Sequence, residues 1–258
     1  MTILRLGNQS VQIDKGELVS YMVSGHEFIH QKGSPGWRNS DTEMFPIIGP
    51  TNEANFRVVT PKGDAIQDQH GLLREMTYEV THQTQTKVVF EKKYLANTTV
   101  KNSKFPAKST AEKLAWPYAF QFVKSFELKE NGLEIVFKII GEAEMPFMLG
   151  YHPAFKLNGS ETIIQTDKQR ITLPEVMAVG SRAFQVANCE HIVLKDENAL
   201  EISTEGFGSF MLWTEVTNMV CIEPITFYPY TVSQDQLHLG FDKISDNPKQ
   251  FKVLLKPL

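Results

Sequence analysis

The stretch AFQFVKSFELKENGLEIVFKII, residues 119–140, decides the fold because apolar and polar side chains alternate along it. A period of two is the spacing of a β-strand, whose successive side chains point to opposite faces. The apolar faces of the two halves consist of Phe120, Phe122, Phe126 and Leu128, and of Leu133, Ile135, Phe137 and Ile139. Between the halves lies KENG, residues 129–132, in which Asn131 and Gly132 can adopt positive φ. The stretch therefore predicts a β-hairpin with one apolar face.

Short runs with the same period recur along the rest of the chain. They are SVQID, ELVSYMVS, EFIHQ, NFRVV, MTYEVTHQ, KVVFEKKY, TIIQT, HIVLK, LEIST, SFMLW, MVCIE and FKVLLK. Seventeen phenylalanines and many valines, isoleucines and threonines also favour strands. Only AKSTAEKLA, residues 107–115, has the pattern of a short helix. With no break in composition, the sequence predicts an all-β fold, a large two-sheet sandwich in a single domain over residues 1–258.

Composition and charge exclude several classes of partner. The net charge is −4 and no basic run is long enough to follow a phosphate backbone, so we expect no nucleic-acid partner. No stretch approaches the ~18 apolar residues that a membrane helix needs, and the N-terminus lacks the pattern of a signal peptide. Cys189 and Cys221 have no CxxC spacing, which predicts neither a disulfide framework nor a zinc knuckle. We therefore expect a soluble protein of a reducing cytoplasm, with no membrane partner.

Two residues with acid–base chemistry lie within apolar runs. Glu223 ends the strand MVCIE just before Pro224, where partial loss of water raises the pKa of a carboxyl toward general-base duty. A salt bridge or a turn acceptor at a strand end is the alternative for such a carboxylate. His152 lies in PFMLGYHPAF, residues 146–155, as the single histidine of an apolar and aromatic run. It is either a packing residue or a proton donor held in a dry pocket.

His70 and Arg74 form a second polar group, in QDQHGLLRE, residues 67–75. Gly71 permits close approach of the backbone, and the two side chains offer several hydrogen-bond donors. Arg74 could also merely cover an apolar surface with its stem. His26 and His30 in GHEFIH lie four positions apart on one face of a predicted strand, with no cysteine nearby, and the metalloprotease motif requires a helix, so we expect no metal site there.

Six segments follow one another in a recognisable order: KGELVSYMVSGHEFIHQ, MFPIIG, QHGLLRE, WPYAFQFVKSFEL, MPFMLGYHPAF and VCIEP. In order and approximate spacing they resemble the aldose 1-epimerase (galactose mutarotase-like) superfamily, particularly its branch related to galactose mutarotase. Each segment is weak alone, but six in sequence are specific, and the resemblance runs nearly from end to end.

The resemblance implies a β-supersandwich of antiparallel sheets with an open sugar-binding cleft. It also implies that Glu223 is the general base that takes the proton from the anomeric hydroxyl, and that His152 is the acid that protonates the ring oxygen. His70 and Arg74 match residues that hold sugar hydroxyls or the ring oxygen. The partner would be a small sugar, with no metal and no other cofactor, and the protein a monomer or a homodimer.

The chain departs from this resemblance at Pro50. Many relatives carry an arginine directly after the glycine that matches Gly49, and proline offers neither a side-chain donor nor a backbone N–H. Recognition of the sugar is therefore expected to differ from that in galactose mutarotase. An additional sugar-binding aspartate has no clear match, and both Asp68 and Asp41 are candidates.

Two other functions remain open at this stage. One is a non-catalytic sugar-binding or sugar-sensing protein on the same scaffold, because a fold does not fix a function. The other is a glycoside-cleaving enzyme, which needs a second carboxylate about 5 to 9.5 Å from Glu223.

Overall fold

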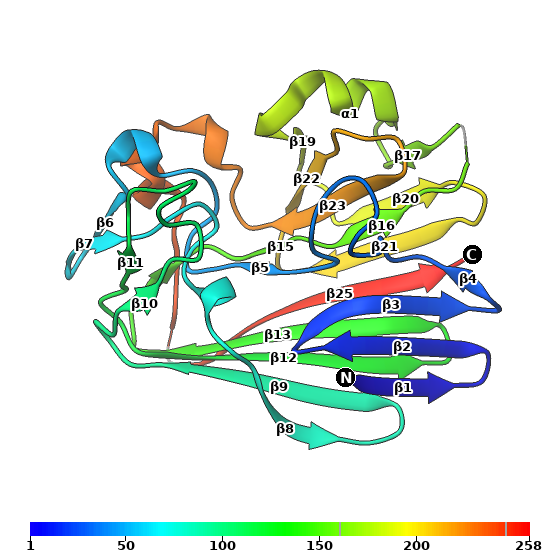
Figure 1. The fold of residues 1–258 in the computed structure, drawn as a ribbon, viewed down its shortest axis with the longest axis horizontal. Helices are drawn as coiled ribbons and strands as arrows, with labels where there is room; N and C mark the ends of the chain where they lie inside the picture. The colour runs from blue at the N-terminus through cyan, green and yellow to red at the C-terminus, as the bar shows by residue number, and fades with distance from the viewer. Residues whose placement is uncertain (160, 246) are drawn as a thin grey trace.

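The computed structural model describes residues 1–159, 161–245 and 247–258. Two large β-sheets face each other, and a smaller sheet from the N-terminal strands lies beside them (Figure 1). Every strand pairing among the described residues is antiparallel, as the sequence pattern predicted. The predicted all-β sandwich is therefore confirmed.

The larger sheet has nine strands, and the predicted hairpin lies near its middle. In spatial order its strands are β18 (Arg170–Thr172), β17 (Ile163–Gln165), β20 (His191–Lys195), β21 (Leu200–Glu205), β25 (Lys249–Pro257), β13 (Gly132–Gly141), β12 (Phe120–Lys129), β9 (Lys87–Tyr94) and β8 (Glu79–Gln83).

The second sheet has six strands and carries the polar residues found in apolar runs. Its strands are β19 (Phe184–Ala187), β22 (Ser209–Trp213), β23 (Met219–Ile225), β15 (Gly150–Tyr151) and β5 (Glu43–Met44), with β16 (Ala154–Lys156) also paired to β23.

The N-terminal sheet lies along the nine-stranded sheet, with β1 against β9 and β12 (Figure 1). Its strands are β1 (Thr2–Leu6), β2 (Gln9–Asp14), β3 (Glu17–Val23) and β4 (His26–Glu27). Three small strand pairs complete the sheets: β6 (Arg57–Thr60) with β7 (Gly63–Ile66), β10 (Val100–Lys101) with β11 (Lys113–Leu114), and β14 (Pro146–Phe147) with β24 (Asp242–Lys243).

Helical segments are short and lie in the connections. They are α1 (Leu173–Val179) and the 3₁₀ turns η1 (Asn52–Ala54), η2 (Leu73–Glu75), η3 (Gly180–Arg182), η4 (Pro229–Thr231) and η5 (Gln234–Gly240). Among the described residues, no helix is long and apolar enough to cross a membrane.

The hairpin of residues 119–140 forms as predicted. β12 pairs with β13 from Phe120 opposite Gly141 to Lys129 opposite Gly132. The positive φ, 148°, falls on Gly132. A Cβ there would lie 2.2 Å from the carbonyl oxygen of Leu255, so glycine is required at this position. Along β12 every second side chain is buried, and the aromatic rings of the hairpin reach the second sheet, where Phe137 contacts Tyr151.

The predicted helix at residues 107–115 is wrong. The Ser109 hydroxyl accepts hydrogen bonds from the side chain of Asn102 and from the backbone of Ala111, a local pattern that competes with helix formation. Leu114 then pairs with Val100 in β10–β11.

The helix that does form, α1, was not predicted, although its start carries helix signals. Thr172 and Glu175 make a capping box, and Pro174 lies in the first turn. The segment is only 7 residues long, too short for a periodic apolar pattern to stand out.

One side chain on the apolar face of β12 is charged. Lys124 is fully buried, and its ammonium lies 2.8 Å from Asp41 Oδ2 and 2.6 Å from Glu43 Oε1. Because Lys124 belongs to the nine-stranded sheet while Glu43 lies on β5, this ion cluster joins the two sheets in the interior.

Replacing Lys124 with methionine should lower the free energy of unfolding by about 3–5 kcal/mol, because two buried carboxylates lose their cation. Urea denaturation at neutral pH measures this change. The control is Lys138→Met, which removes an exposed lysine of the neighbouring strand β13 and should change stability by less than about 0.5 kcal/mol. Equal stabilities of the two variants would contradict the proposed importance of the cluster.

Candidate functional site

A cavity of about 250 Å³ opens over the six-stranded sheet, and all four predicted site residues line it. Glu223 comes from β23, His152 follows β15, and His70 and Arg74 come from the loop and turn before β8. The structure thus brings together side chains that are up to 153 positions apart (70 to 223) in the chain.

Glu223 and His152 meet at the floor of the cavity. His152 Nε2 lies 3.4 Å from Glu223 Oε1, and the two side chains are only 8% and 2% exposed. The strand β23 brings Glu223 there because its alternate residues face the cavity side, and Glu223 pairs with Met211 of β22, another residue of the cavity wall. This geometry allows a proton to be shared between the carboxyl and the imidazole.

Burial moves the two pKa values apart. It raises the pKa of Glu223 to about 8, while the positive charge of Arg74 opposes that rise. Burial and then Arg74 lower the pKa of His152 to about 3. Between these values the pair holds one proton, and in the empty site it lies on Glu223, with both groups neutral.

Aromatic side chains enclose the imidazole. Trp37 stacks on His152 with ring centroids 3.9 Å apart and planes at 21°, and Trp213 meets it edge-on at 6.5 Å. His30 fixes the Trp37 loop, since its Nε2 donates to the Trp37 carbonyl over 2.9 Å. Trp37 was not predicted as a site residue, because the sequence of a turn-rich loop does not indicate which side chain its tryptophan will contact.

His70 is held beside His152 by an unusual backbone. Its φ is 72° and that of Gly71 is 75°, two left-handed residues in a row. A Cβ on Gly71 would lie 2.2 Å from the Phe45 carbonyl oxygen, which explains the glycine. The rings of His70 and His152 are 5.7 Å apart. Burial, followed by the charge of Arg74, keeps the pKa of His70 well below its usual value, so His70 is neutral.

Arg74 and Lys104 are the cations of the cavity lining, and Lys104 is paired with Asp68. One guanidinium nitrogen of Arg74, Nη2, donates to Thr42 Oγ1 over 3.2 Å. Its buried Nε, like the Nδ1 atoms of His70 and His152, has no hydrogen-bond partner among the described residues. Buried polar atoms without a partner are rare, and here three of them surround one cavity, as expected for a site that receives a polar ligand.

The candidate aspartates lie elsewhere. Asp41 is buried with Lys124, and Asp68 is held by Asn102 and Lys104. Neither belongs to the described lining of the cavity, whose carboxylates are Glu223 and the exposed rim residue Glu215.

A metal ion would find one possible donor set among the described residues. His152, Cys221 and Glu223 have ligand atoms within 4.8 Å of one another, because Cys221 and Glu223 share a face of β23. Of these three residues, His152 and Glu223 line the cavity, and they are also the pair that shares a proton.

A model of the aldose 1-epimerase family matches residues 57–196. Among solved structures, the chain resembles a galactose mutarotase-like protein from Lactobacillus casei, with a TM-score of 0.83, 15% identity, and complete coverage of both chains. A galactose mutarotase related enzyme from Lactobacillus acidophilus gives a TM-score of 0.77 and 19% identity over 98% of this chain and 96% of that one. These likenesses show the fold, and a search of curated protein sequences returned no match.

Replacing Arg74 with methionine should raise the pKa values of both Glu223 and His152, because its charge lowers both. Titration of the His152 ring nitrogens and the Glu223 carboxyl carbon by NMR measures the two shifts. Arg170→Met, at an exposed position on β18, is the control and should leave both unchanged. A shift of the two values in opposite directions would contradict this electrostatic role.

Proposed function

Because the chain belongs to the aldose 1-epimerase family, we propose that it interconverts the α and β anomers of an aldose or a related sugar. The observation that supports this most strongly is the buried His152–Glu223 pair, 3.4 Å apart at the floor of a cavity. Opening and closing a sugar ring requires one group that accepts a proton and one that donates it, and this pair has both capacities.

In the proposed reaction, Glu223 takes the proton of the anomeric hydroxyl while His152 protonates the ring oxygen. The bond between C1 and the ring oxygen breaks, and the open aldehyde forms. Rotation about the C1–C2 bond then presents the other carbonyl face, and closure with reversed proton transfers gives the other anomer. The pair begins and ends with one proton.

This reaction requires the shared proton to lie on His152 when the sugar is bound. Sugar hydroxyls that donate to Glu223 would stabilise its carboxylate, which lowers its pKa from about 8. The proton then moves over the short distance to the imidazole, which Trp37 holds in place by stacking.

His70 and Arg74 would orient the sugar. Neutral His70 can donate to or accept from a hydroxyl, and the free Nε of Arg74 can donate to the ring oxygen or to a hydroxyl. Both line the cavity together with His152 and Glu223, so both can reach a pyranose bound at the pair. Proton transfer alone completes the proposed reaction, so it calls for no metal or redox cofactor.

Glycoside cleavage is less well supported. It needs a second carboxylate about 5 to 9.5 Å from Glu223, whereas the side chain paired with Glu223 is the imidazole of His152. The other carboxylate of the cavity wall, Glu215, is exposed at the rim.

Glu223→Gln and His152→Asn should each slow mutarotation by about 10²–10⁴-fold, because each removes one proton-transfer group. Polarimetry on freshly dissolved α-anomers, or NMR exchange between anomers, measures the rate above buffer. Glu205→Gln, at an exposed carboxylate of β21, should keep the full rate. Full activity of both site variants would refute the mechanism, and sugar binding by the wild type with no acceleration would favour a non-catalytic sugar-binding protein.

The kcat/KM of the wild type should be flat from about pH 5 to 7 and fall about tenfold per pH unit above pH 8. Above the Glu223 pKa of about 8 the pair loses its one proton, and nothing remains to protonate the ring oxygen. On the acid side His152, with a pKa of about 3, stays neutral, so the pair keeps its single proton. A profile that turns down near pH 6.5, the value of an ordinary histidine, would contradict this assignment.

A further inference from the structure

A second chamber of about 450 Å³ lies next to the catalytic cavity, and four residues line both. We propose that this chamber is a subsite for a neutral glycosyl unit, so that the substrate is a reducing disaccharide or a longer oligosaccharide. This inference rests on the proposed epimerase function and specifies its substrate.

The two chambers share one wall. Gln69, Ser181, Pro229 and Tyr230 line both of them. The two chambers are therefore neighbours, and in the proposed complex the substrate extends past these residues from the first chamber into the second. The second chamber is also the larger, which a single sugar ring bound at the His152–Glu223 pair would leave unused.

The departure from the family pattern lies on this route. Gly49 lines the first chamber and Pro50 lines the second. A Cβ on Gly49 would lie 2.4 Å from Pro229 Cβ, so the backbone passes tightly under the shared wall there. At the next position the short ring of Pro50 leaves open the volume that a long arginine side chain would enter.

The second chamber has the chemistry of a carbohydrate site. Its polar groups include the amides of Asn52, Gln69 and Gln234 and the hydroxyls of Ser181 and Ser233. The charged side chains among its described lining are one of each sign, Glu53 and Arg182. Balanced charge with many amides and hydroxyls suits a neutral, hydroxyl-rich ligand, whereas a phosphate calls for several cations.

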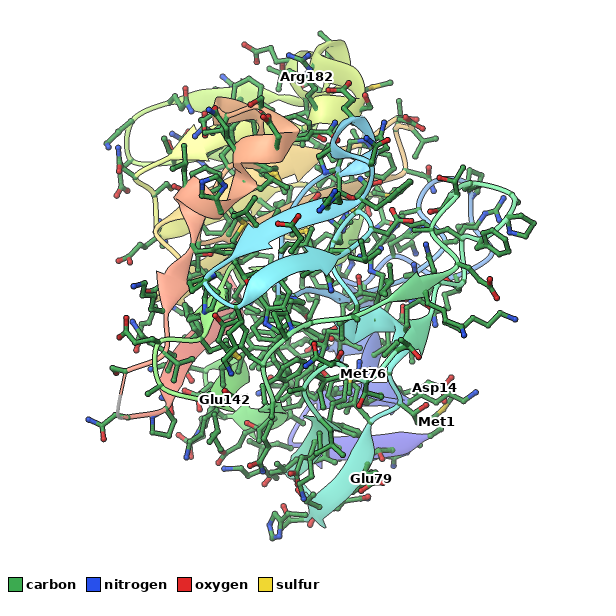
Figure 2. The ribbon with its side chains drawn as sticks, turned by 90° about the vertical axis from the view of Figure 1, so that its left-hand side faces the viewer. Met1, Asp14, Met76, Glu79, Glu142 and Arg182 are labelled. Carbon is green, nitrogen blue, oxygen red and sulfur yellow. The ribbon has the colours of Figure 1, made fainter. Side chains whose placement is uncertain are left out.

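Tyr230 supplies the apolar surface on which the C–H face of a sugar ring can pack. Its hydroxyl donates to the Ser181 carbonyl over 3.3 Å, and the neighbouring Tyr228 donates to the Ala183 carbonyl over 3.1 Å, which joins η4 to the segment after α1. The Arg182 guanidinium carbon lies 6.0 Å from the Tyr230 ring centroid. Figure 2 shows Arg182, which is exposed, at the end of the view opposite to Met1 and Glu79.

The chemistry fixes which end of the substrate enters first. Ring opening acts on the hemiacetal of the reducing sugar, so that residue must occupy the chamber of His152 and Glu223. The next glycosyl unit then lies beyond Tyr230. No glycosidic bond is broken, and the only bond that opens and closes is that between C1 and the ring oxygen of the reducing residue.

The test compares kcat/KM for mutarotation of monosaccharides with that of disaccharides and trisaccharides that have the same reducing residue, measured by NMR exchange. We expect the wild type to favour the best oligosaccharide over its monosaccharide by about tenfold or more, the effect of one well-made contact with a charged or polar group. Equal values for both would overturn the inference while leaving the epimerase function intact, and acceleration of no sugar would overturn both.

Two variants locate the effect. Pro50→Leu narrows the second chamber with a side chain that adds no hydrogen-bond donor, Arg182→Ala removes its cation, and neither residue lines the catalytic chamber. Each should lower kcat/KM for the oligosaccharide by about tenfold and leave the monosaccharide within about twofold. Arg170→Ala is the control, and thermal melts verify folding. Unchanged oligosaccharide rates in both variants would overturn the subsite, as would a preference for 6-phosphorylated monosaccharides that Arg182→Ala abolishes.

Discussion

The buried ion cluster of Lys124, Asp41 and Glu43 is the constraint on which the rest of the structure depends. A lysine ammonium without water needs opposite charges at close range, and β12 places it beside Glu43 of β5 and Asp41, two residues earlier in the chain. Asp41 also accepts hydrogen bonds from the Tyr151 hydroxyl and the backbone of Leu18. One carboxylate therefore holds together the nine-stranded sheet, the six-stranded sheet and the N-terminal sheet. Apolar packing alone would hold these layers together with less positional precision, because it has no fixed direction.

The same cluster positions the site above it. Thr42, between the two carboxylates in sequence, accepts the backbone N–H of His152 over 2.8 Å with its carbonyl. Its hydroxyl accepts a hydrogen bond from Arg74. Tyr151, which donates to Asp41, directly precedes His152. The imidazole and the guanidinium that lowers its pKa are thus attached to a segment that the buried charges hold in place. A shift of β5 would move both groups relative to Glu223, which lies on β23.

Much of this arrangement could be predicted from the sequence, and the failures have physical causes. The alternation of apolar and polar residues predicted the hairpin and most strands, because a strand with one buried face has a period of two in its sequence. The order of the sequence motifs, through their resemblance to a known family, predicted that Glu223, His152, His70 and Arg74 belong to one site. Lys124 was missed although it interrupts the apolar face of its own strand, a position where a charge implies a buried partner. The position of Trp37 and the shape of the second chamber depend on how loops fold over the sheet. Loop sequences have no periodic pattern from which that folding could be predicted.

The division between strands and loops also separates catalysis from recognition. Glu223 and His152 lie in or directly beside paired strands, where the ladder fixes the backbone and the buried cluster fixes the layers. The walls that would contact the rest of a sugar come from connections: the turn at Pro50, the segment of Arg182, and η4. A substitution in these connections changes the volume and the polar groups of the second chamber without moving the proton-sharing pair. Proline at position 50, where the resemblance implies an arginine, is therefore compatible with the proposed acid–base chemistry, and its effect would fall on which sugar, and how long a sugar, reaches the pair.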